Sequence, residues 1–443
     1  MNEFWKSSSW LSGLQWLFFI FTNTVVIPIT VGAAFGLSQG SIASILQLSF
    51  IVTGIACMVQ ALIGHQRAIM EGQSGLWWGV ILTLSSIAVA QDMPLAVLGG
   101  SLAIGVILSG LLTITIGLTG LGPILAKLFN PAVMGVFMFL FGVKLIGIFL
   151  KGMLGIPFGN DADSATIDLS VSLLSIIIAI IVIVISIKAP PNIRRYALLI
   201  GIVIGWIAYN LTFGGQATVE QTASSGFAFF PLGEPVWNTG VIITAILAGL
   251  LNTANTFGAL KGTDNMYQKE TTNGQYRASF TITGIFTSLA GVLGLVPYAP
   301  YVSSIGFLNQ TGIIKRVPFI IGGLMFFVMG IIPPIGHFFS LLPLSIGSAV
   351  LFVSYLQLLN SSWNFFQEVE FTSLNVYRSA IPLFVGIIIM TLPPSYFETI
   401  PGTVRPLLSS GLLVGIILAL LLENIFKWDR DSRQISDSED IQH

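Results

Sequence analysis

Apolar stretches long enough to cross a membrane alternate with short polar connections along almost the whole chain. A helix needs about 20 mostly apolar residues to cross the hydrocarbon core of a bilayer, so each stretch predicts one transmembrane segment. The expected fold class is therefore an all-α polytopic membrane protein. The pattern predicts fourteen segments, at residues 11–30, 42–63, 72–90, 94–118, 132–150, 169–187, 196–213, 237–260, 278–297, 298–313, 317–336, 341–359, 379–396 and 406–425.

The third and tenth segments are interrupted by glycine, proline and polar residues. The third begins with the sequence Glu71-Gly72-Gln73-Ser74-Gly75. The start of the tenth, at residues 297–306, holds two prolines, two tyrosines and two serines. Non-helical backbone at membrane depth must be buried in protein or line a wet cavity, because unpaired amide groups are costly in lipid. Two broken segments at corresponding positions of the two halves are the best pointer to a transport site. We expect short broken segments, with short strands possible there, around one central cavity.

Composition agrees with this class. Of 443 residues, 54% are hydrophobic and 8% charged, with a mean hydropathy of +0.89. A soluble core has no room for so much apolar surface. The net charge of −1 gives no reason to expect a nucleic-acid partner, and the single cysteine, Cys57, excludes an internal disulfide.

Basic residues indicate the orientation of the segments. With a cytoplasmic amino terminus, fifteen of the 18 Lys and Arg residues fall on the cytoplasmic side, two fall outside and Lys144 lies within a segment. This bias is the positive-inside rule, and it places both termini in the cytoplasm. The two outside residues are Lys151 and Arg405.

Fourteen segments divide into two sets of seven, and an odd number gives the second set the opposite orientation. Inverted repeats of this kind are common in secondary transporters. A Pro-x-x-x-Gly sequence opens both the fifth segment, from Pro131 to Gly135, and the twelfth, from Pro343 to Gly347. The acidic, polar residues 428–443 predict a disordered cytoplasmic tail.

Several of these motifs, in this order, resemble the nucleobase/ascorbate transporter family, which includes bacterial uracil, xanthine and uric acid permeases. The motifs are the Gln-Trp-Leu of residues 15–17 with Val25–Pro28, the small residues and glutamine of 54–60, the stretches 64–67 and 71–74, the Pro-x-x-x-Gly entry at 130–135, and Gly306 with Thr311 and Gly312.

The resemblance implies a uracil-permease-like architecture that divides into a core and a gate. Core residues would be 1–128 (segments one to four) and 232–337 (eight to eleven); gate residues would be 129–231 (five to seven) and 338–427 (twelve to fourteen). It also implies a secondary active transporter (permease) of the plasma membrane that imports nucleobases by alternating access. The resemblance further implies that transport is coupled to a proton or a sodium ion, that no cofactor is needed, and that the protein forms a homodimer through the gate.

The sequence departs from the family at the substrate site. Where relatives carry a glutamate in segment eight, this chain has Asn252; Ser303 and Ser304 replace an acidic or amide residue followed by asparagine, and Trp16 replaces a histidine. An amide offers both donors and an acceptor, so Asn252 can pair with the –NH–C=O edge of a base. The alternative is a hydrogen bond that only joins helices.

Further candidates for the substrate site come from the same segments. Trp77 and Phe257 are aromatic rings that can stack on a heterocycle, or simply pack between helices. Thr256, Ser303 and Ser304 offer hydroxyls. Gly75 stands where relatives carry an aromatic residue, and the loss of bulk at Gly75, Ser303 and Ser304 favours oxopurines such as xanthine or uric acid over uracil.

Two ionisable residues inside the apolar segments are harder to interpret. Glu71, at the mouth of segment three, is a candidate for ion coupling or a charge that stabilises a helix amino terminus. Lys144 is either functional or a lysine whose ammonium reaches an end of the segment.

No metal-ligand cluster, nucleotide-binding loop or catalytic triad appears in the sequence, so we do not expect an enzyme. Three other functions stay open: a sulfate or bicarbonate anion exchanger of the same architecture, a uracil permease, and a membrane scaffold that transports nothing.

Overall fold

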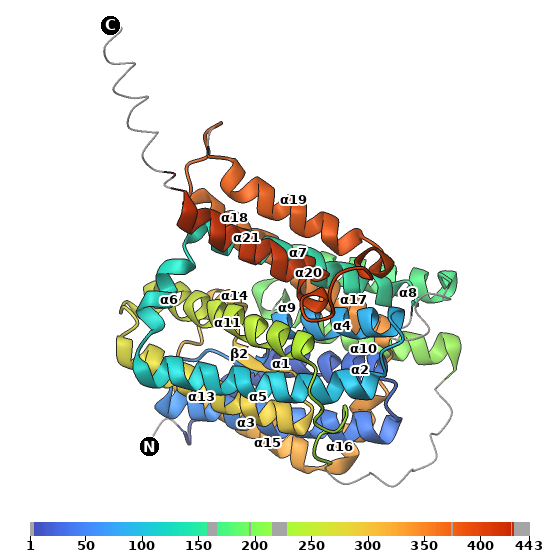
Figure 1. The fold of residues 1–443 in the computed structure, drawn as a ribbon. Coiled ribbons are helices and arrows are strands. Elements are labelled where there is room, and N and C mark those ends of the chain that lie inside the picture. The colour runs from blue at the N-terminus through green and yellow to red at the C-terminus, as the bar shows by residue number, and fades with distance from the viewer. Residues whose placement is uncertain are drawn as a thin grey trace, which may run out of the picture.

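The computed structural model describes residues 4–156, 166–194, 196–214, 228–373, 375–426 and 428 (Figure 1). In these residues the fold is helical apart from two short strands and one 3-10 turn. The predicted tail at 428–443 lies outside the described residues except for Trp428.

The first half of the chain contains one strand and ten helices within the described residues. They are α1 (Ser7–Thr24), α2 (Val26–Ala34), α3 (Gln39–Ile63), β1 (Glu71–Gln73), α4 (Gly75–Ala90), α5 (Leu95–Thr119), α6 (Gly122–Leu128), α7 (Pro131–Met153), α8 (Leu169–Lys188), α9 (Pro191–Arg194) and α10 (Ala197–Phe213).

The second half repeats the pattern with more interruptions. Its elements are α11 (Thr239–Gly262), α12 (Asp264–Tyr267), α13 (Asn273–Leu293), β2 (Tyr298–Pro300), α14 (Ser304–Thr311), α15 (Arg316–Ile331), α16 (Pro333–Ser340), α17 (Leu344–Tyr355), α18 (Gln357–Gln367), α19 (Tyr377–Thr391), η1 (Pro394–Phe397), α20 (Arg405–Leu408) and α21 (Gly411–Ile425).

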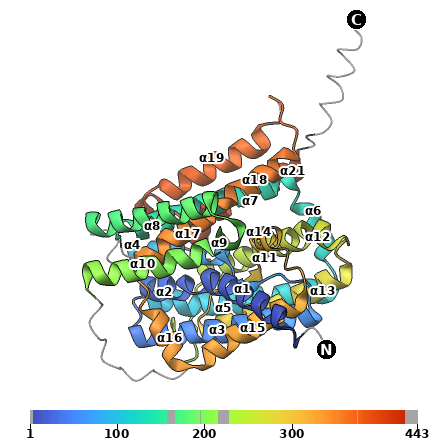
Figure 2. The same ribbon diagram turned by 180° about the vertical axis from the view of Figure 1, so that it is seen from behind.

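The long helices lie in two layers. In Figures 1 and 2 helices α7, α18, α19 and α21 form the upper layer, and α3, α5, α13 and α15 lie in the lower one. Helices α8, α10 and α17 extend the upper layer, with α17 packed on both α7 and α8. The short helix α4 and the helix α11 lie between the two layers (Figure 1).

Small residues let helices in the lower layer approach closely. A Cβ on Gly54 of α3 would lie 2.6 Å from the carbonyl oxygen of Gly323 in α15, and one on Gly110 of α5 would lie 2.7 Å from that of Gly284 in α13. Close backbone contact through glycine is how helices pack in lipid, where the hydrophobic effect does not drive their association.

Both predicted interruptions are present as strands. β1 pairs with β2 in antiparallel register, with Glu71 opposite Pro300 and Gln73 opposite Tyr298. Two more backbone bonds extend the pairing, from Ser74 N to Pro297 O at 2.7 Å and from Tyr301 N to Met70 O at 2.8 Å. Each strand therefore satisfies the other's amide groups inside the membrane, as the prediction of broken segments three and ten requires.

The eleventh predicted segment, 317–336, is wrong at its end. Helix α15 stops at Ile331, and the chain turns by 88° into α16. Pro333 and Pro334 explain the break, because a proline in a helix interior removes an amide donor and clashes with the preceding turn. The twelfth segment continues beyond its predicted end at 359, because α17 and α18 form one apolar span over Leu344–Gln367.

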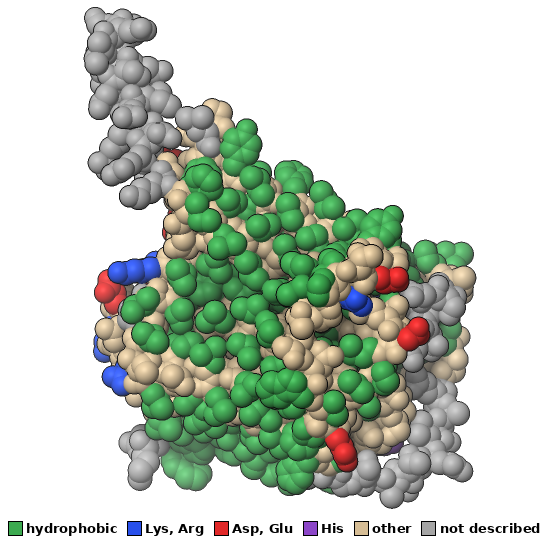
Figure 3. Space-filling view, viewed as in Figure 1, with side chains coloured by type: hydrophobic (Ala, Val, Ile, Leu, Met, Phe, Trp, Pro, Cys, Tyr) green, Lys and Arg blue, Asp and Glu red, His purple; other side chains and the backbone are tan. Residues whose placement is uncertain are grey.

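The surface matches a membrane protein. Seven helices of the described chain are long and apolar enough to cross a bilayer, and α4, α10, α19 and α21 are shorter apolar helices. In Figure 3 hydrophobic side chains cover the middle of the face, and most visible Lys and Arg side chains gather at its left edge. We call this the basic end. The helix termini that the orientation prediction assigns to the cytoplasmic side carry Lys127, Arg194, Lys261, Arg277 and Arg316.

Candidate functional site

The crossing of β1 and β2 brings two helix amino termini together at the centre of the fold. One residue, Ser74, separates β1 from α4, and three residues separate β2 from α14. Neither Ser74 nor Ser303, the residues that precede these helices, caps its helix with a side-chain hydrogen bond. First-turn N–H groups lack helical partners and carry the positive end of the helix dipole, so these termini suit carbonyl oxygens or anions.

Asn252 of α11 links the two crossing segments. Its Oδ1 accepts hydrogen bonds from Ser74 Oγ at 2.6 Å and from Asn255 Nδ2 at 3.0 Å, and its Nδ2 donates to the carbonyl of Tyr298 at 2.9 Å. The side chain is 5% exposed. An amide nitrogen carries two hydrogens, so Asn252 keeps one donor beyond these bonds.

Two tyrosines of the tenth segment, which sequence reasoning did not select, hold the crossing. Tyr301 Oη donates to the main-chain oxygen of Gln73, and also lies 3.3 Å from that of Asn23 in α1. Tyr298 Oη lies 3.0 Å from Thr53 Oγ1 of α3. A tyrosine buried among broken helices needs a partner for its hydroxyl, which is the signal that could have identified them.

Glu71 is fully buried in β1 rather than at the mouth of segment three. Its two oxygens accept hydrogen bonds from Thr283 Oγ1 at 2.7 Å and from Gln60 Nε2 at 3.1 Å. Within the described residues, no Lys, Arg or His side chain lies within 4.0 Å of it. A carboxyl held by neutral groups can bind or release a proton without breaking an ion pair, because a threonine hydroxyl both donates and accepts.

Gly75 does not leave an open space. A Cβ at this position would lie 2.5 Å from the ring of Phe141, which reaches it from α7. Tyr355 of α17 packs against the same ring, with centroids 6.2 Å apart. The upper layer therefore supplies the aromatic group that the sequence lacks at Gly75, and the argument for purines from lost bulk falls away.

The other predicted site residues lie at different depths. Trp77 is fully buried against Gly249 of α11, and its indole N–H has no partner in the described structure. Phe257 packs with Phe129, Tyr276 and Phe280, toward the basic end. Thr256 is buried beside it.

The two serines of segment ten differ in environment. Ser303 is exposed, whereas Ser304 is buried and its Oγ accepts a hydrogen bond from Met70 N at 3.1 Å. Ser304 therefore helps to hold β1, and Ser303 is the hydroxyl open to a ligand.

Arg67, in the connection between α3 and β1, ties the two halves together at the basic end. Its guanidinium donates to Asp264 Oδ1 at 2.8 Å, to Thr263 Oγ1 and to the carbonyls of Leu260 and Lys269. The side chain is 2% exposed and lies over the ring of Tyr267. These charge-assisted hydrogen bonds fix the chain that leads into β1.

His65 lies beside this network and is fully buried. Burial, with the nearby charge of Arg67, lowers the pKa of His65 to about 3. The ring is therefore neutral, and its Nδ1 accepts a hydrogen bond from the Arg67 backbone N–H at 3.1 Å.

Lys144 lies on α7 where the upper layer meets α4. Its side chain contacts Gly79, one turn after Gly75, and no acidic side chain of the described chain lies within 4.0 Å of it.

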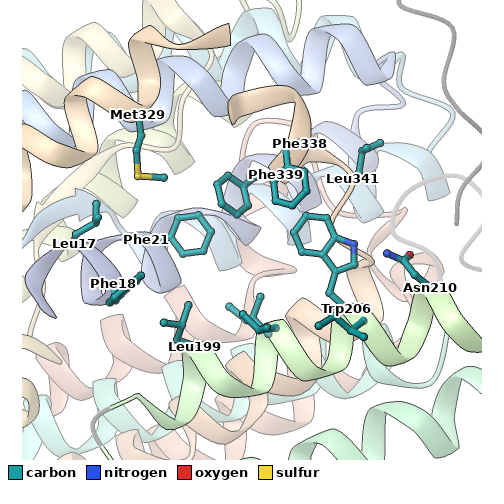
Figure 4. Close-up of a pocket in the computed structure, with 13 residues that line it drawn as sticks. Leu17, Phe18, Phe21, Leu199, Trp206, Asn210, Met329, Phe338, Phe339 and Leu341 are labelled. Carbon is teal, nitrogen blue, oxygen red and sulfur yellow. The ribbon is translucent and has the colours of Figure 1, made fainter. Parts of the chain in front are cut away.

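A cavity of about 540 Å³ lies apart from the crossing, between α1, α10, α15 and α16 (Figure 4). Its walls are hydrocarbon apart from the indole nitrogen of Trp206 and the amide of Asn210, and none of the predicted site residues contributes to it. Val203 and Ile207 on its rim are about half exposed on the membrane surface. This cavity offers a base too few polar partners to be its site.

Residues 7–395 match the permease family (Xan_ur_permease). The YwdJ protein of Bacillus subtilis is 28% identical, over 95% of this chain and 96% of its own length. The xanthine permease of B. subtilis is 22% identical, over 99% and 98%, and its uric acid permease PucJ is 22% identical, over 96% and 93%. The family and these relatives are named as permeases, which are transporters and not enzymes.

The transmembrane domain of the cyanobacterial bicarbonate transporter BicA has the same fold. It superposes with a TM-score of 0.61 at 17% identity, covering 94% of this chain and 97% of that one. SLC26A9 gives a TM-score of 0.58 at 11% identity, covering 94% and 64%. The predicted inverted-repeat transporter fold is thereby confirmed.

Proposed function

This chain belongs to the nucleobase/ascorbate transporter family of permeases, and from that premise we propose that it is a secondary active importer of nucleobases. Oxopurines such as xanthine or uric acid are the expected cargo, because the names of several relatives specify these bases. The observation that carries the proposal is the pair of uncapped half-helices α4 and α14, joined by β1, β2 and Asn252.

The base would lie at this crossing. The remaining hydrogen of Asn252 Nδ2 and the first-turn N–H groups of α4 are donors for ring carbonyls, and Ser303 can donate or accept. Phe141, which covers Gly75, is placed to contact the face of a ring. This assignment keeps Asn252 and Ser303 as ligands and gives Ser304, Trp77 and Phe257 supporting positions.

Alternating access follows from the two layers. We assign the core to residues 1–128 and 232–337 and the gate to 129–231 and 338–427, so that Phe141, Lys144 and Tyr355 belong to the gate. Movement of the gate against the core would expose the crossing to each side in turn. A homodimer through the gate completes the arrangement that the family resemblance implies.

We assign ion coupling to Glu71. It is the buried carboxyl beside the crossing, it pairs with no cation in the described residues, and its neutral partners suit a change of protonation. A proton is the ion that this environment favours over sodium, since a sodium site needs several oxygen ligands around the ion.

Uptake into reconstituted vesicles tests the proposed function. Radiolabelled xanthine or uric acid is expected to accumulate when the vesicles carry an inward proton gradient, with uracil taken up less well. Uptake of sulfate or bicarbonate that purines do not inhibit would favour the anion exchanger. The bicarbonate transporter BicA has the same fold as this chain. No substrate counterflow with any of these compounds would favour a scaffold.

Asn252→Ala is expected to weaken base binding by about 1–3 kcal/mol, the scale of a lost buried hydrogen-bond partner. Binding is measured by calorimetry or by the ligand-induced rise in melting temperature. Asn255→Ala is the matched control, because among the described residues the Asn255 side chain makes one hydrogen bond, to Asn252. Equal affinity of wild type and Asn252→Ala would show that Asn252 only joins helices and does not bind the base.

Orientation gives a separate prediction. A cysteine at Glu234 is expected to react with an impermeant thiol reagent from outside the cell, and a cysteine at Asn265 only after permeabilisation. Both residues are exposed, and the native Cys57 is fully buried. The physical reason is the excess of basic residues at the end that carries Asn265. The reverse labelling pattern would contradict the fourteen-segment topology.

A further inference from the structure

Helix α18 carries an exposed polar stripe within a membrane-spanning segment. Gln357, Asn360 and Asn364 are all exposed and recur at spacings of three and four residues, which places them on one side of the helix. Amide side chains at this depth are costly in hydrocarbon and mark a water-filled path or a protein contact.

The other faces of α18 differ in chemistry. Leu358 and Phe366 pack against Gly142 and Gly135 of α7, and Ser362 Oγ donates to the Gly135 carbonyl. Leu359 and Trp363, 58% and 61% exposed, form a separate apolar face suited to lipid or to a second copy. The amide stripe is therefore distinct from the surface that meets hydrocarbon.

Helical periodicity shows which way the stripe points. In α17, Ile346 and Val350 pack against Gly205 and Gly201 of α10. Leu356 joins α17 to α18 in the right-handed helical conformation, and the two helices form one span. Gln357 and Asn364 follow Val350 at steps of seven residues, close to two full turns, so the stripe continues the side of α17 that faces α10. Helix α10 in turn faces α1 of the core across the cavity of Figure 4, so this side of the gate is directed toward the core. In α17 this side is covered by α10, whereas in α18 its side chains are exposed.

The core presents an open face at the same end. On α14, Ser303 and Asn309 are exposed, and a Cβ added to Gly306 between them would meet nothing within 4 Å. The start of α14 lies near α7, because a Cβ on Gly258 would lie 3.3 Å from both Val302 and Met134. The first turn of α7 thus lies beside the start of α14, and the same turn of α7 packs against Phe366 of α18.

At the end opposite the basic end, the same two layers are closed. A Cβ on Gly240 of α11 would clash with the carbonyl of Gly402. Arg405 Nη1 donates a hydrogen bond of 3.3 Å to Oε1 of Gln91, the residue that follows α4. Gly347 of α17 packs on Val26 of α2. The layers are thus tightly packed at this end, whereas at the basic end they meet at Phe129 and Phe257 and leave the α14 positions and the α18 stripe exposed.

We propose that the stripe of Gln357, Asn360 and Asn364 lines the aqueous passage by which the base leaves the crossing toward the cytoplasm. The amides would exchange hydrogen bonds with the N–H and C=O groups of a planar heterocycle in place of water. This proposal rests on the proposed transport function and adds to it the gate-side surface that meets the substrate after release.

Cysteine accessibility tests the proposal in the full-length protein, with Cys57→Ala as background. Asn360→Cys and Asn364→Cys are made singly, with Leu359→Cys and Trp363→Cys as matched controls on the apolar face of the same helix. A charged methanethiosulfonate reagent is applied to inside-out vesicles. Because thiols react as thiolates, which form in water, the stripe positions are expected to react at least about tenfold faster than the controls.

Transport by each modified variant is then measured. Attachment of the charged group to Asn364→Cys is expected to abolish uptake of radiolabelled xanthine, whereas the same treatment of Leu359→Cys is expected to leave uptake unchanged. Equal reaction rates on the two faces, or full uptake after modification at Asn364→Cys, would overturn the proposal. Failure of the proposed function would look different, because no purine would be taken up even by unmodified protein while the difference in labelling persisted.

Discussion

Arg67→Met is expected to lower the free energy of unfolding by about 3 kcal/mol, the low end of the cost of removing one partner from a buried ion pair, because the Asp264 side chain is 22% exposed. The substitution keeps much of the apolar stem but removes the guanidinium that Asp264 and the carbonyls of Leu260 and Lys269 share as a donor. Thermal unfolding of detergent-purified protein, followed by size-exclusion of the heated samples, measures the loss. The effect is large because one guanidinium joins the chain before β1 to the connection after α11.

Arg316→Met is the matched control for this experiment. Arg316 lies at the same end of the molecule and is exposed, and its guanidinium makes one long hydrogen bond of 3.4 Å to Ala61 O. Its replacement is expected to change stability by no more than about 0.5 kcal/mol, as for other surface positions. Equal melting temperatures for the two variants would show that the Arg67 network contributes nothing beyond a surface contact.

Glu71→Gln is expected to abolish accumulation of the base against its concentration gradient while leaving the base bound and exchanged. The amide has the shape of the carboxyl and keeps a hydrogen-bonding group for Thr283 and Gln60, but it cannot carry a proton. With one proton per base, each pH unit across the membrane supports about tenfold accumulation, since about 1.4 kcal/mol is a factor of ten. The variant should reach only equal concentrations inside and outside.

Two assays on the same vesicles separate loss of coupling from loss of folding. Counterflow, in which unlabelled base inside exchanges for labelled base outside, needs no net proton movement and should survive in Glu71→Gln. Concentrative uptake with an imposed pH gradient should be lost. If the variant still accumulates base using the proton gradient, Glu71 is not the proton carrier.

The broken segments were predictable because their cause is local. Pro297 and Pro300 remove backbone donors, and glycines at 72 and 75 weaken the local preference for helix, so an uninterrupted lipid-exposed helix is unfavourable there whatever the rest of the chain does. The alternation of apolar stretches and basic connections is equally local, and it located every long helix. The end of α15 was missed although its cause, Pro333 with Pro334, was visible, because the apolar run continues through it.

The site was less predictable because its partners are distant in sequence. Nothing around Gly75 indicates that Phe141 fills the space beside it, and nothing around Glu71 identifies Thr283, 212 residues away, as its hydrogen-bond donor. Asn252 was selected by position, but its bonds to Ser74 and Tyr298 exist only once three segments have met. Contacts of this kind depend on the tertiary structure, which local patterns do not specify.

The pairing of β1 with β2 also constrains how the protein is made. Synthesis delivers β1 to the membrane long before β2, since Glu71 and its partner Pro300 are separated by most of the chain. Until the second half arrives, the amide groups of β1 have no strand to bond, so the first half alone is an incomplete structure with polar backbone inside the bilayer. The two halves thus form a single cooperative unit of assembly, and a truncated chain that ends before β2 would be a target for quality-control proteolysis rather than half of a transporter.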